Sequence, residues 1–136
     1  MTTIVTRSGK GSPLSNTELD QNFINLNTDK LEYIVETTAS TTSLTPSIDT
    51  TQSNITALAA DLTINNPSGG TPADSHKFIL RIKDNGTIRN LSWGTIYRGV
   101  GSTLPIATVA GKILYMGFVY NDTDSKMDLV SVMIQD

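Results

Sequence analysis

The sequence has no cysteine and a single histidine, His76. Without cysteine the chain forms no disulfide and offers no thiolate nucleophile. Thiolate and imidazole are the side chains that most transition-metal sites use, so one imidazole makes a poor metal site. We therefore predict a protein without a metal, without a cofactor and without enzymatic activity.

Positive charge and long apolar runs are also scarce. Ten Lys and Arg stand against 13 Asp and Glu, which gives a formal net charge of -3. Binding to a phosphate backbone calls for basic clusters, so we expect no nucleic-acid partner. The longest apolar run, Ile113–Tyr120, is far shorter than the roughly 20 residues that span a bilayer. The first residues lack the apolar core of a signal peptide, and we expect neither secretion nor membrane insertion.

Apolar residues make up only 38% of the 136 residues, and Thr, Ser and Asn take their place. A chain of this composition buries a modest core, and small cores often gain stability from oligomerisation.

Residues 14–35 carry the signals of a helix, after a polar leader at 1–13 that we expect to be extended. Ser15 and Glu18 have the spacing of a capping box, in which each side chain bonds the backbone amide of the other residue. Apolar residues follow at helical spacing, with the first two at the positions of a hydrophobic staple: Leu14, Leu19, Phe23 and Leu26.

A second apolar pattern follows a Ser- and Thr-rich linker at 36–45. Its residues recur at the 4-3 spacing of heptads: Leu44, Ile48, Thr51, Ile55, Leu58 and Leu62. So narrow a stripe cannot bury itself, so the pattern predicts a stalk helix whose apolar residues form the seam of a trimer. The alternative is that this helix packs on the C-terminal domain of its own chain.

After the loop at 65–74 the apolar period changes from helical to two, which is typical of strands. Asn85-Gly86 is a favoured pair for a type I′ hairpin turn, and that hairpin would place Phe78 opposite Trp93. The runs Ile113–Tyr120 and Met127–Ile134 predict two further strands. Residues 76–136 therefore predict about five strands of a small antiparallel sandwich or barrel.

Three acidic residues lie in the turn between the last two predicted strands, Asp122, Asp124 and Asp128. A calcium loop needs an oxygen ligand at its fifth position and Gly at its sixth, where this turn has Lys126 and Met127. We interpret the segment as a polar turn. The sequence singles out no pair of carboxylates and no catalytic triad.

Two stretches of the sequence then carry a resemblance to a known family: "NPSGGTPADSHKFILRIKDNGTIRNLSWGTIYRGVGSTLP" and "GKILYMGFVYNDTDSKMDLVSV". They resemble a C-terminal module of tailed-bacteriophage tail-fibre and related virion proteins, over about residues 67–134. Ser75 replaces a usual Gly, and Met127 a usual Trp. The stretch "LSNTELDQNFINLNTDKLE" is similar to the segment by which phage fibre and tail proteins attach to the particle.

The resemblance implies a homotrimeric virion component located in the tail or baseplate and assembled in the host cytoplasm. Together with the patterns above, we expect an α+β chain with a short coiled-coil-like stalk and a small antiparallel β-sandwich. The expected parts are an attachment region at 1–35, the linker and stalk at 36–66, and the sandwich at 67–136. The attachment region would bind a tail, baseplate or capsid protein.

Two alternatives to a tail fibre or fibre adaptor remain open at this point. One is a capsid decoration or head-fibre protein. The other is a module that binds a host surface glycan through a few aromatic and polar residues of the sandwich: Tyr97, Arg98, Asp122 and Asp124.

Overall fold

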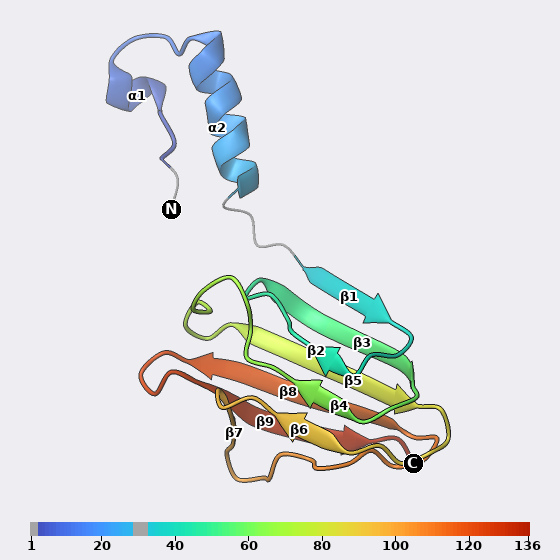
Figure 1. Ribbon diagram of the computed structural model, residues 1–136. Helices are drawn as coiled ribbons and strands as arrows, with labels where there is room; N and C mark the ends of the chain where they lie inside the picture. The colour runs from blue at the N-terminus through green and yellow to red at the C-terminus, as the bar shows by residue number, and fades with distance from the viewer. Residues whose placement is uncertain (1–2, 29–32) are drawn as a thin grey trace. The chain divides into compact units, whose positions relative to one another are not determined.

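A computed structural model describes residues 3–28 and 33–136 (Figure 1). The chain divides into two compact units, Met1–Glu32 and Tyr33–Asp136. The structure is mostly β, with 43% strand and 12% helix, and its two helices are short. The expectation of a short coiled-coil-like stalk helix within residues 36–66 is therefore wrong, and these residues belong to the β unit instead.

The N-terminal unit contains α1 (Arg7–Lys10) and α2 (Asn16–Thr28). The capping box is confirmed: the Ser15 amide donates to Glu18 Oε2 over 2.7 Å, and the Glu18 amide donates to Ser15 Oγ over 3.2 Å. The expectation that the helix runs to residue 35 is wrong, since β1 begins at Ile34. Residues 29–32 of that prediction lie outside the described residues.

The expectation that the leader at 1–13 is extended is also wrong in part. The leader contains α1, and its first described residues lie against α2. Asn22 forms a reciprocal pair with the backbone of Val5, with both hydrogen bonds at 2.8 Å. One turn further, Asn25 Nδ2 donates to Thr3 O over 2.6 Å. Residues three apart share a face of a helix, so these two asparagines fasten the leader along one side of α2.

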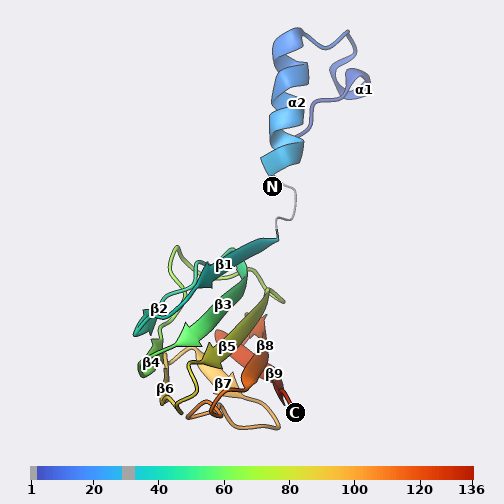
Figure 2. The same ribbon diagram turned by 90° about the vertical axis from the view of Figure 1, so that its right-hand side faces the viewer.

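The C-terminal unit has two sheets (Figures 1 and 2). The larger sheet has the order β1-β3-β5-β8-β9-β7 and is mixed, and the smaller has the order β2-β4-β6 and is parallel. The strand bounds are β1 Ile34–Thr38, β2 Ser43–Leu44, β3 Thr50–Leu58, β4 Leu62–Ile64, β5 Lys77–Asp84, β6 Leu91–Trp93, β7 Tyr97–Gly99, β8 Ile113–Asn121 and β9 Lys126–Ile134.

The first six strands form three stacked coils of a solenoid. Each coil places one strand in the larger sheet and the next in the smaller, so that β1, β3 and β5 pair in parallel, as do β2, β4 and β6. The corners stack as well, because Asn65 Nδ2 donates to the hydroxyls of Ser43 and Thr45, at 2.8 and 2.9 Å. A predicted antiparallel sandwich is thus replaced by parallel coils.

The antiparallel part of the unit closes one end of the stack. The β8–β9 hairpin continues the larger sheet beyond β5, which confirms the two strands predicted there and the turn between them. The segment 105–108 covers the outer edge of β6, where the Leu91 amide donates to Ile106 O and Trp93 Nε1 to Pro105 O. The other end of the stack consists of β1 and β2.

The apolar core lies between the two sheets and includes most of the expected trimer seam. Leu44, Ile55, Leu58 and Leu62 are buried in it, and Ile48 is half-buried at a corner. Heptad-like spacing arises here because short strands alternate with corners and because the register of β3 shifts between Ile55 and Leu58. Thr-rich segments favour strands over helices, and the stripe faces its own core.

The hairpin expected at Asn85-Gly86 is also wrong. The strands on either side of it, β5 and β6, lie in different sheets. A type I′ turn needs positive φ at both central residues, and here Gly86 has φ 94° while Asn85 is not in the positive-φ region. The chain therefore turns a corner from one sheet to the other, and Phe78 meets Phe118 rather than pairing with Trp93.

A buried carboxylate fixes this corner. Asp84 is 2% exposed and accepts hydrogen bonds from the amides of Gly86 and Gly111 and from the hydroxyl of Thr108, at 2.9, 2.7 and 2.6 Å. Burial opposes ionisation of the carboxyl group, but these three bonds and the charge of Arg89 outweigh it and lower its pKa. The carboxylate thus ties the end of β5 to the segment before β8.

We expect Asp84→Asn to lower the free energy of unfolding by about 2 kcal/mol, since an amide nitrogen would face donors. The lowered pKa also predicts a pH dependence. The contribution of Asp84 is complete above the unfolded-state pKa of 3.8 and is lost as the pH falls through the lower folded-state pKa. Urea unfolding of both proteins between neutral and acid pH measures this, with the exposed Asp49→Asn as the matched control. An equal loss of unfolding free energy in Asp84→Asn and Asp49→Asn would contradict this role of Asp84.

Candidate functional site

An apolar stripe on α2 is the most exposed feature of the N-terminal unit. Leu19, Phe23 and Leu26 are 42%, 70% and 58% exposed, at positions i, i+4 and i+7 of one helical face. Leu14, the other residue predicted for attachment, is half-buried. The face of α2 that holds Asn22 is occupied by the leader. The capped, leader-bound helix therefore presents its apolar stripe to the outside of this unit.

Glu18 strengthens the start of this helix by a charged contact. A hydrogen bond from the Lys10 ammonium, followed by the bonds from Ser15, lowers the pKa of Glu18 to about 2. The side chain thus stays ionised at neutral pH and holds the end of α1 near the first turn of α2.

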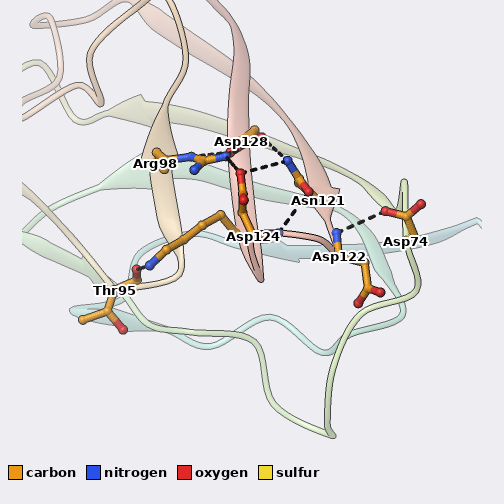
Figure 3. A network of polar contacts seen from close by, with 8 residues as sticks. Asp74, Thr95, Arg98, Asn121, Asp122, Asp124 and Asp128 are labelled. Atoms are coloured by element: carbon orange, nitrogen blue, oxygen red, sulfur yellow. Dashed lines mark hydrogen bonds and ion pairs between the residues drawn. The ribbon is translucent and has the colours of Figure 1, made fainter.

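A polar cluster joins β7 to the β8–β9 turn (Figure 3). Arg98 on β7 makes a fork with Asp128, where Nε donates to Oδ1 over 2.8 Å and Nη2 to Oδ2 over 3.0 Å. The same Nη2 donates to Asp124 Oδ2 over 2.9 Å. Asn121 Nδ2 completes the cluster with longer bonds to both carboxylates, each at 3.3 Å.

The electrostatics of the cluster fit a clamp better than an open binding site. The hydrogen bond from Arg98 lowers the pKa of Asp128, although burial opposes that shift. The bonds to Asp128 and Asp124 in turn raise the pKa of Arg98. Because the guanidinium is already shared between two carboxylates, an anionic ligand would have to compete with them.

The structure brings together only part of the predicted receptor-contact set. Arg98 and Asp124 are in direct contact, while the amide of Asp122 donates to Asp74 Oδ1 over 3.1 Å on another side of the turn (Figure 3). Tyr97 is 6% exposed, its ring packs edge-on against Phe118, and its hydroxyl donates to Asn65 O. Burial raises the pKa of this phenol. Its ring is therefore not available to stack on a sugar.

Residues 3–28 and 33–136 contain neither a metal-binding cluster nor a membrane-spanning helix. Within these ranges no group of three or more His, Asp or Glu side chains is arranged to hold a metal ion. His76 is half-exposed, and its Nε2 lies 3.0 Å from Thr50 O. None of the helices described is long and apolar enough to cross a membrane.

A small hollow opens in the first coil of the solenoid, a feature that the sequence did not reveal. It measures about 220 Å³ and is lined by one carboxylate, four Thr, one Ser and one Leu: Glu36, Thr37, Thr38, Thr41, Ser43, Leu44 and Thr45. Glu36 Oε1 accepts a hydrogen bond from the buried hydroxyl of Thr50 over 3.0 Å. The sequence pattern of residues 36–66, which predicts a linker and a stalk helix, does not indicate this hollow. The hollow forms only because β1 and β2 face each other in the folded chain.

Comparison with known proteins adds no relative. No family model, no curated protein and no solved structure matches the chain.

We expect Arg98→Gln to lower the free energy of unfolding only modestly, because the fork with Asp128 is partly exposed to solvent. Amide hydrogen exchange should speed up in β7 and in residues 121–126 while β5 stays protected. Asp122→Asn is the matched control, since its side chain takes no part in the fork. An unchanged exchange rate in β7 would show that the clamp is dispensable.

Proposed function

We propose that this chain is a structural component of a phage virion, a small tail fibre or fibre adaptor. Its N-terminal unit binds another tail or baseplate protein, its β unit is displayed from the particle, and it catalyses no reaction. The observation that carries the proposal is the exposed stripe of Leu19, Phe23 and Leu26 on a helix held in shape by its own leader. The resemblance of both parts of the chain to phage fibre proteins supports the same reading.

The physics of the stripe suits attachment. Apolar anchors at i, i+4 and i+7 are the pattern by which an amphipathic helix binds a hydrophobic groove. Phe23 is the central and most exposed anchor, and aromatic anchors often dominate such interfaces. A helix of 13 residues is marginal alone in water, so the capping box and the leader contacts prepare it for binding.

The apolar stripe at 44–62 does not form an intermolecular seam. The trimer was expected from the resemblance and from a helical seam, and the seam residues Leu44, Ile55, Leu58 and Leu62 are instead core residues of one chain. Tyr97, the aromatic residue of the expected glycan-contact set, is buried and packs against Trp93, so its ring does not supply a stacking surface.

Purified particles of the phage that encodes this chain provide the test. Mass spectrometry should detect the chain in them, and particles made without it should take up the recombinant protein. We expect Phe23→Asp to weaken this uptake at least about tenfold, the effect of losing one interface anchor. Val130→Asp, at an exposed apolar residue of β9, is the matched control and should bind like the unmodified protein.

Two results would refute the proposal. One is the absence of the chain from purified particles. The other is undiminished uptake of the Phe23→Asp protein, with its helical content preserved by circular dichroism.

A further inference from the structure

The two ends of the solenoid differ in how their strand edges are covered. At one end the β8–β9 hairpin, β7 and the segment 105–108 cover the last coil. At the other end β1 is the outermost strand of the larger sheet and β2 of the smaller one, and no further strand among the described residues pairs with either (Figures 1 and 2). Uncovered edges carry unpaired amides and carbonyls that can pair with another strand.

The interior changes in character toward the open end. Along one column of the larger sheet, cross-strand partners run from Val132 and Met116 through Leu80 to Ser53 and Glu36. A parallel column ends at Thr38, the partner of Ile55. The core is thus apolar at the covered end and polar at the open end, where the hollow lies. A polar end tolerates water but also offers donors and acceptors to a neighbour.

We propose that the open end pairs with the same end of a second copy of this chain. A partner must present two strand edges at the spacing of β1 and β2, and the chain itself has such a pair. A twofold rotation about an axis normal to the sheets sets β1 antiparallel to its counterpart and turns the two β2 edges toward each other. A twofold pairing occupies the open ends of both copies, so it closes at two copies.

The residues that line the hollow form the rim of the open end. This rim is self-complementary apart from one charge. Thr and Ser hydroxyls both donate and accept, so two copies of the rim can bond each other. Glu36 is the only ionisable residue that lines the hollow. Like charges directly opposite are unfavourable, which excludes the register with Glu36 opposite Glu36. The pairing proposed is the next register with a residue on the axis, which places Glu36 opposite Thr38 of the other copy. In this register Thr37 lies opposite Thr37 on the twofold axis.

The contact is small. β1 has five residues and β2 has two, against the roughly 20–30 residues on each side of a standard interface. The pairing is therefore weak and depends on concentration, with a dissociation constant of about 10 μM to 1 mM. It is separate from attachment through α2, so either proposal can fail without the other.

The absence of cysteine makes a crosslinking test clean. Thr37 is exposed and lies on the axis, so oxidised Thr37→Cys should form a covalent dimer of twice 14.6 kDa, about 29 kDa. Val130→Cys is the matched control, since Val130 is 59% exposed and lies on β9, away from the open end of the stack. It should crosslink at least about tenfold more slowly.

Light scattering of the uncrosslinked full chain gives the second measurement. Between about 10 μM and 1 mM the average mass should rise from 14.6 kDa toward about 29 kDa. Thr37→Lys, which sets two ammonium groups opposite each other, should stay monomeric, while Val130→Lys should behave like the unmodified chain. If Thr37→Lys fails to fold, the crosslinking comparison decides alone.

Several results would overturn the proposal. They are equal crosslinking at positions 37 and 130, a monomeric mass over the whole range, and a mass that rises to three copies. A further one is a dimer that persists in a folded Thr37→Lys protein. A dimer abolished by Phe23→Asp would also overturn it, because the association would then run through α2.

Discussion

The structure of the β unit depends on parallel pairing of successive coils. Each coil gives one strand to each sheet, so every added coil extends both backbone ladders and the core between them at once. A single coil could not bury its apolar side chains alone. This is the general reason why the repeats of a solenoid stabilise one another. The low apolar content of the chain is sufficient because the apolar side chains that are buried gather in one core cluster between the two sheets.

The corners decide whether the coils can form. Asp84 accepts hydrogen bonds from two amides and a hydroxyl at the point where the chain leaves the larger sheet. Asn65 links neighbouring corners by donating hydrogen bonds to Ser43 and Thr45. These polar residues have specific hydrogen-bond partners in distant parts of the sequence, unlike the polar residues of a simple solvent-facing turn. Many of the Ser, Thr and Asn residues that make the sequence look like linker are therefore part of the stacking.

The two proposals place different contacts on different parts of the chain. Attachment uses an apolar helical stripe whose shape is fixed by local contacts, whereas pairing of two copies uses strand edges that the fold leaves uncovered. The two surfaces are also chemically distinct, one apolar and one rich in hydroxyl groups.

The sequence by itself determined the features whose partners lie nearby: the capping box at Ser15 and Glu18, the alternation of β5, and the β8–β9 hairpin. Tertiary structure alone decided the rest. The 44–62 stripe became strands because its burial depends on a second sheet, and Asp84 turned the Asn85-Gly86 hairpin into a corner by bonds to residues more than twenty positions away. Local spacing cannot encode such contacts, since 4-3 spacing suits a helix and a strand–corner–strand coil equally well.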